Sequence, residues 1–111
     1  MPRRTKSSPL DEVFAALANP TRRDILDALL KQELSAGDLA AKFDMARASV
    51  SEHLRALRET GLIEERQDGR FRYYSMSTDP LATLFDWVSP YERFWRERFN
   101  PLNDVLDRME D

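Results

Sequence analysis

The hydrophobic period of the sequence changes at Gly61, and this change limits the folds that the chain can adopt. Before Gly61, apolar residues recur every three or four positions, as in amphipathic helices. After it, the runs L-I-E-E-R-Q and R-F-R-Y-Y-S-M flank Asp68-Gly69, a dipeptide typical of two-residue hairpin turns. The sequence therefore predicts two strands within residues 62–76, with Glu65 opposite Arg72.

Four helices are predicted before the hairpin and one after it. The first spans residues 10–17. Asn19 suits the N-cap of the second because Pro20 follows it, and Ser35 with Asp38 forms a capping-box pattern for a short third helix. The fourth helix covers 46–60 and ends at a glycine.

This order of elements is the layout of a winged helix–turn–helix, a mainly α fold with a small β-hairpin that is typical of DNA-binding domains. We expect this domain over residues 10–78, after a flexible basic arm at 1–9. Residues 79–111 then form a C-terminal dimerisation helix that kinks or restarts near Pro90.

The helix at 46–60 has two chemically different faces. Val50, Leu54 and Leu57 form an apolar stripe. The remaining surface carries small, polar and charged side chains, namely Arg47, Ala48, Ser49, Ser51, Glu52, His53 and Arg55. Small residues let a helix approach the groove floor, and serine, glutamate and arginine can bond bases or phosphates. A solvated helix face would show the same pattern, but the hairpin that follows favours DNA contact.

His53 lies nearer the core edge of this helix, where a structural hydrogen bond and a DNA contact are equally good interpretations. In the hairpin, Arg66, Arg70 and Arg72 would suit a wing that lies along phosphates. They could instead pair with the two glutamates at 64 and 65, and we expect a mixture. Arg70, nearest the turn, is the preferred wing contact, with Arg72 shared between DNA and Glu65.

The net charge of −3 does not exclude a DNA partner, because the acidic excess is confined to one end. Residues 76–111 contain four Lys/Arg and eight Asp/Glu, a balance of −4, whereas residues 35–75 contain seven of each. No apolar run approaches the ~18 residues of a membrane span, and the N-terminus lacks the apolar stretch of a signal peptide. We expect a cytoplasmic protein with no membrane partner.

Four motifs occur in a characteristic order along the chain. They are L-A-N-P-T-R-R-D-I-L (17–26), S-A-G-D-L-A (35–40), A-S-V-S-E-H-L-R-A-L-R-E-T-G-L-I (48–63) and D-G-R-F-R-Y-Y (68–74). Together they resemble the ArsR/SmtB family of bacterial winged-helix repressors. The resemblance implies a homodimer that binds a palindromic operator in double-stranded DNA and releases it when an inducer arrives. It also implies that Arg47 to Arg55 form the recognition helix and that the wing centres on Arg70.

The sequence departs from this family in two respects. Metal-sensing members carry cysteines around the stretch that here reads S-A-G-D-L, and a second metal site uses histidine on the last helix. This chain has no cysteine and a single histidine outside that helix, so we expect neither metal nor other cofactor. Members often have Ser or Thr where Ala46 stands; here either Asp44 caps the recognition helix or its first turn is looser.

Aromatic residues concentrate after position 84, and a chain of 111 residues has little interior in which to hide them. A two-fold interface between terminal helices is the simplest outlet. The residues expected there are Leu10, Val13, Phe14, Leu84, Trp87, Val88, Tyr91, Trp95, Phe99 and Leu102. Alternatively, some of them cover the domain's own core or line a pocket for a small apolar effector.

Two other functional classes compete with DNA recognition. A winged helix can serve protein–protein assembly, which the overall acidity and the Glu64-Glu65 pair favour slightly. An enzyme is disfavoured, since the chain has one His, no Cys, three Gly and no motif with catalytic spacing. The operator, the inducing signal and the choice between repression and activation are left open, and the signal could be an organic ligand or a partner protein.

Overall fold

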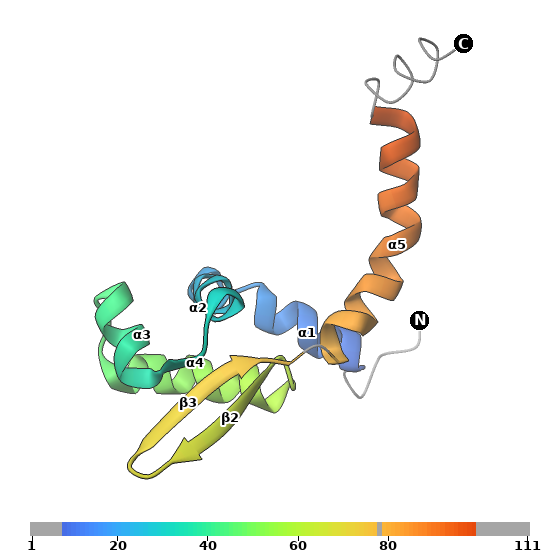
Figure 1. Cartoon of the computed structure of the whole chain (residues 1–111). Helices are drawn as coiled ribbons and strands as arrows, with labels where there is room; N and C mark the ends of the chain where they lie inside the picture. The colour runs from blue at the N-terminus through green and yellow to red at the C-terminus, as the bar shows by residue number, and fades with distance from the viewer. Residues whose placement is uncertain (1–7, 78, 100–111) are drawn as a thin grey trace, which may run out of the picture.

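A computed structural model of the chain describes residues 8–77 and 79–99 (Figure 1). Four helices precede a β-hairpin and a long last helix, which confirms the predicted winged helix–turn–helix. The sequence pattern misses one short strand, β1, which lies before α3 and pairs with β3. The elements are α1 (Pro9–Leu17), α2 (Pro20–Lys31), β1 (Leu34–Ser35), α3 (Ala36–Phe43), α4 (Arg47–Glu59), β2 (Ile63–Asp68), β3 (Phe71–Met76) and α5 (Asp79–Phe99).

The predicted N-caps of α2 and α3 are confirmed. Asn19 Oδ1 accepts a hydrogen bond from the backbone N–H of Arg22 at 3.1 Å. Ser35 and Asp38 exchange reciprocal side-chain to backbone bonds of 3.1 and 3.2 Å. Each cap satisfies backbone donors that the first turn of a helix leaves without a partner.

Helix α1 begins one residue earlier than predicted. Ser8 is its N-cap and forms a capping box with Asp11, so α1 begins at Pro9. Ser8 and Pro9, which were expected in the flexible arm at 1–9, therefore form the N-cap and the first residue of the helix. The rest of that arm lies outside the described residues.

A single apolar core is formed by residues from the four helices α1, α2, α3 and α4 and from the sheet. The predicted stripe of α4 is confirmed, since Val50, Leu54 and Leu57 are at most 1% exposed. Full burial of such a side chain contributes roughly 1.5–3 kcal/mol. The other buried residues are Val13, Ala16, Ile25, Leu26, Ala28, Leu29, Leu39, Ala40, Leu62, Ile63 and Tyr74. This packing sets the rotation of α4 and leaves its polar face outward.

The hairpin forms where expected, but its register is shifted. The two turn residues are Gly69 and Arg70 rather than the Asp-Gly pair, and Glu65 lies opposite Tyr74 rather than Arg72. Among the described hairpin residues, only Gly69 has a positive φ, of 61°. A type II′ turn needs a positive φ at its first central residue alone, so glycine takes that position and the aspartate remains in the strand.

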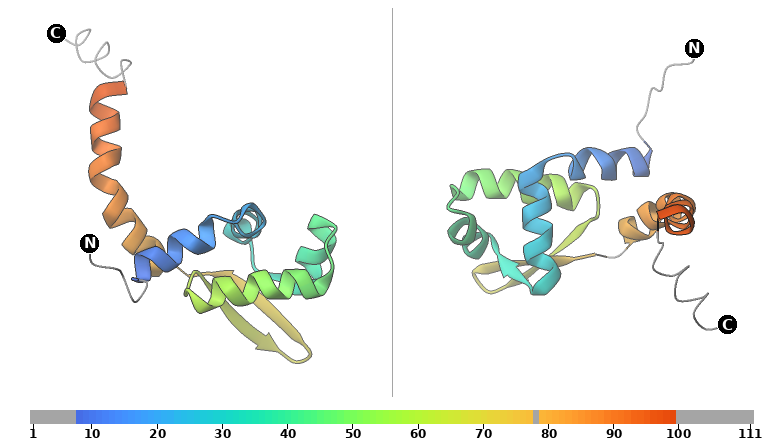
Figure 2. Two further views of the ribbon diagram at one scale, coloured as in Figure 1. Left: turned by 180° about the vertical axis from the view of Figure 1, so that it is seen from behind. Right: turned by 90° about the horizontal axis from the view of Figure 1, so that it is seen from above.

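Helix α5 has 21 residues and stands away from the winged domain (Figures 1 and 2). It continues through Pro90, so of the predicted kink or restart the restart is excluded: Ser89 Oγ donates to the carbonyl of Phe85 at 2.6 Å instead of capping a new helix. None of the residues of α5 is buried. The radius of gyration, 18.7 Å, accordingly exceeds the value of about 13 Å for a compact chain of this length.

The start of α4 has no side-chain cap. Ala46 occupies the N-cap position with φ −65° and ψ 141°, the backbone geometry that a capping side chain requires. Asp44 does not substitute for it, because Asp44 ends α3 in the left-handed region at φ 52°. Of the two alternatives drawn from the sequence, the uncapped first turn is the one observed.

We predict that Ala46→Ser raises the free energy of unfolding by about 1 kcal/mol, because the introduced hydroxyl can accept from the backbone N–H of Ser49. The measurement is chemical unfolding at one protein concentration. Ala41→Ser, on the exposed interior of α3, is the matched control and should give no gain. An equal gain in both variants would contradict the capping explanation.

Tyr74 on β3 is a core residue whose hydroxyl group bonds to Glu65 on the neighbouring strand β2. The residue is 7% exposed and its hydroxyl donates to Glu65 Oε2 at 3.2 Å. Burial, followed by the negative charge of Glu65, raises the pKa of Tyr74 above its ordinary value. The neutral phenol is therefore favoured in the folded protein.

Because the pKa of Tyr74 is higher in the folded than in the unfolded chain, its stabilising contribution is complete below pH ~10 and is lost as the pH rises through the folded value. We predict one tyrosine that ionises later in folded protein than in urea, measured by ultraviolet absorbance. Tyr74→Phe should abolish that late step. Its persistence in the variant would show that another tyrosine causes it.

Candidate nucleic-acid interface

Most of the residues predicted to contact DNA lie on the outward face of α4. Six of them are exposed, namely Arg47, Ala48, Ser49, Ser51, Glu52 and Arg55. The face is exposed because the opposite stripe, from Val50 to Leu57, is in the core. The structure therefore brings these residues together on one surface.

His53 differs from the other predicted contacts. It is half-buried at the edge of the face, and it makes no hydrogen bond within the described part of the chain. The structural hydrogen bond considered from the sequence is thus not formed here. Its ring lies beside the exposed face of α4 without being part of the core.

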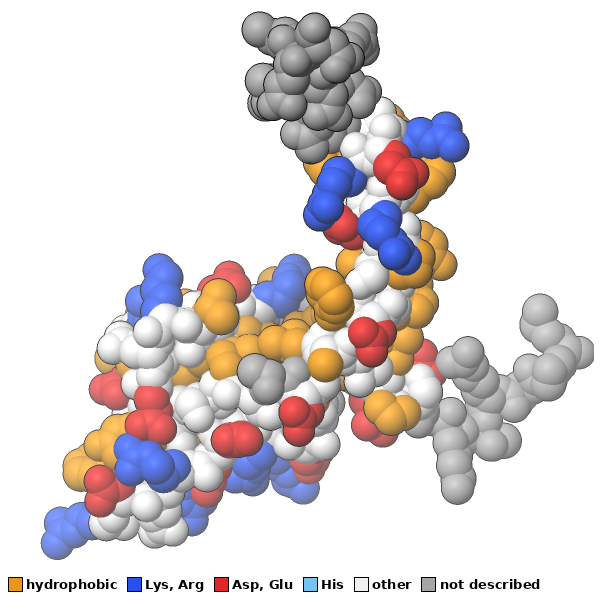
Figure 3. Space-filling view, turned by 45° about the vertical axis from the view of Figure 1, so that its right-hand side comes forward, with side chains coloured by type: hydrophobic (Ala, Val, Ile, Leu, Met, Phe, Trp, Pro, Cys, Tyr) orange, Lys and Arg blue, Asp and Glu red, His pale blue; other side chains and the backbone are white. Residues whose placement is uncertain are grey.

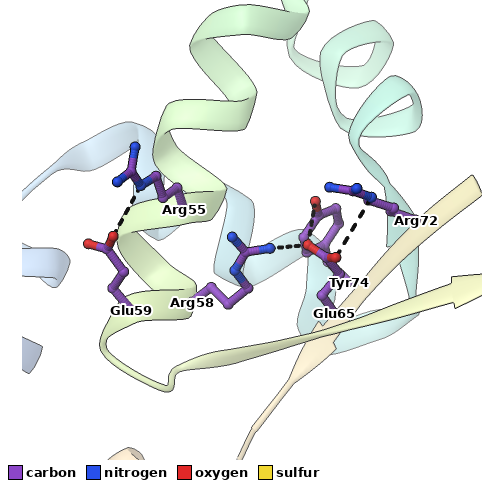
Figure 4. Close-up of polar contacts among 6 residues, drawn as sticks. All are labelled: Arg55, Arg58, Glu59, Glu65, Arg72 and Tyr74. Atoms are coloured by element: carbon purple, nitrogen blue, oxygen red, sulfur yellow. Dashed lines mark hydrogen bonds and ion pairs between the residues drawn. The ribbon is translucent and has the colours of Figure 1, made fainter.

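Arg55 pairs with Glu59 one turn later on α4, at 3.1 Å (Figure 4). The side chains are 74% and 64% exposed. Such a solvated pair contributes little to stability, so the guanidinium group can exchange this partner for another anion at small cost.

A hollow of about 500 Å³ lies between the first turn of α3, the first turn of α4 and the hairpin. Three arginines line it, Arg47 from α4 and Arg70 and Arg72 from the hairpin, together with Ser51. Asp38 is the single acidic residue among its lining residues. The excess of positive charge suits a phosphate backbone.

The hairpin arginines divide into two sets. At the turn, Arg70 has no hydrogen bond or ion pair with any other described residue, and Arg72 Nε lies 3.8 Å from Glu65 Oε1. Arg66 instead lies on the other face of the hairpin, where it pairs with Glu33 at 2.7 Å and stacks on Tyr73. Of the pairings expected from the sequence, Arg72 with Glu65 is present, whereas Arg66 pairs with Glu33 and Asp68 and not with the glutamates at 64 and 65.

Sequence reasoning missed two residues near this surface. Phe71 is 60% exposed beside Arg70 and also lines the hollow. Arg58, in the last turn of α4, donates to the carboxylate of Glu65 on β2 (Figure 4). Helical spacing does place Arg58 on the outward side of α4, but its partner is set by the packing of β2 against that helix.

A second surface is formed by aromatic side chains on α1 and α5. Phe14 contacts Trp87 edge-on at a centroid distance of 5.3 Å, and Trp87 contacts Tyr91 at 4.9 Å. Figure 3 shows hydrophobic side chains along α5 and on the domain next to its base. The exposed large hydrophobic residues of this surface are Phe14, Phe85, Trp87, Tyr91, Phe94, Trp95 and Phe99.

The other residues expected at a dimer interface fall into three groups. Leu10, Leu84 and Val88 are half-buried. Val13 is 2% exposed in the core of its own chain, which leaves it no surface for a second copy. Leu102 lies outside the described residues.

Two further observations concern other kinds of site. Within residues 8–77 and 79–99, no three His, Cys, Asp or Glu side chains are grouped so that they could share a metal ion. The helices of the same residues include none with the length and apolar character of a membrane span.

Comparison with known proteins adds independent information. The family model described as "Bacterial regulatory protein, arsR family" matches residues 19–65, from the cap of α2 into β2. The transcriptional repressor SdpR of Bacillus subtilis is 38% identical over 79 residues, which cover 71% of this chain and 88% of that protein. The HTH-type transcriptional regulator Rv2034 of Mycobacterium tuberculosis is 33% identical over 107 residues, 96% of each.

A solved structure shares the fold as well. An ArsR-like transcriptional regulator from a Rhodococcus species superposes with a TM-score of 0.68 at 30% identity, covering 87% of this chain and 92% of that one. These relatives are regulators of transcription and not enzymes. The chain therefore belongs to the ArsR family of DNA-binding bacterial regulatory proteins.

Proposed function

We propose that this regulator is a homodimeric repressor that binds a palindromic operator. In each subunit, α4 enters a major groove and the hairpin lies along the adjacent backbone, with half-sites about one DNA turn apart. The observation that carries the proposal is the arginine-lined hollow between α4 and the hairpin, directly beside the exposed polar face of α4.

Readout within the groove is assigned by side-chain chemistry. Ala48 and Ser49 are small enough to let the start of α4 approach the base edges. The hydroxyl groups of Ser49 and Ser51 can bond bases or phosphates there. Glu52 has no ion-pair partner in the described chain, and its carboxylate can accept from cytosine N4. Arg55 reaches guanine or phosphate, and His53 contributes from the edge of the face.

Dimerisation is supported by the exposed face of α5. A 21-residue helix without a buried residue, lined by aromatic side chains, leaves a large apolar surface in water. Pairing of two such helices, with α1 beside them, would cover that surface. Residues 79–111 thus serve as the dimerisation segment in this proposal.

The remaining parts of the proposal concern signal and location. We place the protein in the cytoplasm because its DNA partner is there. It is not proposed as a metal sensor, since the chain has no cysteine and one histidine. The rival function, a winged helix used for protein–protein assembly, needs no unpaired arginine at the turn, whereas DNA binding uses Arg70.

We predict that the purified protein selects a palindromic sequence from random duplex DNA and binds it at roughly 10–0.01 nM at physiological salt. The logarithm of affinity should fall linearly with the logarithm of salt concentration. Arg70→Ala should reduce the slope by about one per subunit, because one phosphate contact is lost. Arg55→Ala should weaken operator binding as well.

Lys31→Ala is the control for these two variants, because it removes one exposed positive charge at the end of α2 and should leave the slope nearly unchanged. Both arginine variants should remain dimers. Selection of no sequence would refute DNA recognition and favour the assembly module, whereas equal slopes for all four proteins would contradict the phosphate contact of Arg70.

We predict that Trp95→Glu shifts the protein from dimer to monomer in sedimentation experiments, because it places a charge in the apolar interface. Trp95 is 56% exposed, so the folded monomer tolerates the change. Phe71→Glu, an equally exposed aromatic on the hairpin, is the matched control and should remain dimeric. Dissociation of both variants, or of neither, would contradict an interface on α5.

A further inference from the structure

Strand β2 is tied to a different neighbour on each of its faces. On the face toward α4, the carboxylate of Glu65 accepts hydrogen bonds from Arg58 of α4 and from the hydroxyl of Tyr74 (Figure 4). Arg72 lies 3.8 Å away on the same side. The side chain of Glu65 is 21% exposed, so its bonds are partly shielded from solvent.

On the opposite face, Arg66 is bound to the connection between α2 and β1. Its Nη2 and Nε donate to the two carboxylate oxygens of Glu33, at 2.7 and 3.2 Å. The guanidinium also lies 5.0 Å from the centre of the Tyr73 ring. The hydrogen bond from Arg66 lowers the pKa of Glu33, which favours the ionised carboxylate as acceptor.

Glu65 and Arg66 lie in the middle of β2, whereas Arg70 lies at the turn of the hairpin. The turn that carries Arg70 lies about four residue lengths beyond the level of Glu65, because Asp68 pairs with Phe71, and this is roughly 13 Å along the hairpin. A rotation of about 10° at the level of Glu65 would move the turn by about 2 Å, which is enough to separate the partners of a hydrogen bond. The angle between α4 and the hairpin therefore decides whether Arg70 reaches a phosphate while α4 is in its groove.

We propose that Glu65 is a positioning residue for DNA binding: through Arg58 and Tyr74 it holds the hairpin at the angle that lets α4 and Arg70 engage one DNA segment together. Glu65 itself does not contact DNA. This inference rests on the proposed function. It assigns to an acidic residue beside the DNA surface a favourable effect on binding.

Charge and positioning make opposite predictions for Glu65→Gln. Loss of a negative charge beside the hollow should strengthen DNA binding if Glu65 acts only through its charge. If Glu65 positions the hairpin, the same change should weaken binding about tenfold, since one bond to a charged phosphate is lost or loosened. Binding is measured on the duplex that the unchanged protein selects from a random pool.

Glu64→Gln is the matched control. It changes net charge equally at the neighbouring position, and Glu64 is exposed with no ion pair in the described residues. Its affinity should stay equal to that of the unchanged protein or rise slightly. Arg58→Gln changes net charge in the other direction, yet it breaks the same pair and should also weaken binding.

The decisive measurement combines Glu65→Gln with Arg70→Ala. When Arg70 is absent the hairpin has nothing to position, so Glu65→Gln should cause little further loss. Circular dichroism melting checks that each variant is folded. Tighter binding by Glu65→Gln, or a full tenfold loss that persists with Arg70→Ala, would overturn the proposal. If the unchanged protein selects no duplex, the proposed function fails first and this inference fails with it.

Discussion

Burial of the apolar stripe of α4 is the interaction on which the functional surface depends. Val50, Leu54 and Leu57 are almost completely removed from water by the other helices and the start of β2. Their packing fixes the rotation of α4 about its axis and the place where the hairpin leaves the domain. The small and polar residues of α4 are exposed as a consequence, and they face outward without needing any contact of their own.

The arginines around this surface differ in whether an acidic side chain neutralises them, and this matters more than how many arginines there are. Arg58 and Arg66 are held by Glu65 and Glu33, on two faces of one strand. Arg70 has no such partner among the described residues. A chain with net charge −3 can thus present local positive charge, because its carboxylates neutralise the guanidinium groups that support the wing.

Helix α5 differs from α4 in that it has no buried apolar stripe. Its aromatic residues contact each other and Phe14, but no residue of the helix is buried within the chain. In the winged domain, apolar burial offsets the entropy of ordering the backbone. The helix at 79–99 lacks that burial against the other described residues, and the proposed dimerisation would supply it.

Capping residues and hydrophobic periodicity within short segments were sufficient to predict the order of the helices and strands and many of their ends. Asn19 and Ser35 cap helices because their oxygens reach N–H groups three residues away, and the period change at Gly61 separates helix from hairpin. The candidate contacts on α4 followed from helical spacing alone. They share one face whatever surrounds the helix.

Tertiary structure decided the features that depend on distant residues or on competing local signals. The turn moved by one residue because a type II′ conformation places the positive φ on Gly69 alone. Pro90 stayed inside α5, and Val13 proved to be core rather than interface. The sequence by itself determined the winged fold and the polar face of α4, since both arise from periodicities within single elements. Only the folded chain determined which arginines are free, because Arg66 meets Glu33 across 33 residues and no local spacing encodes that contact.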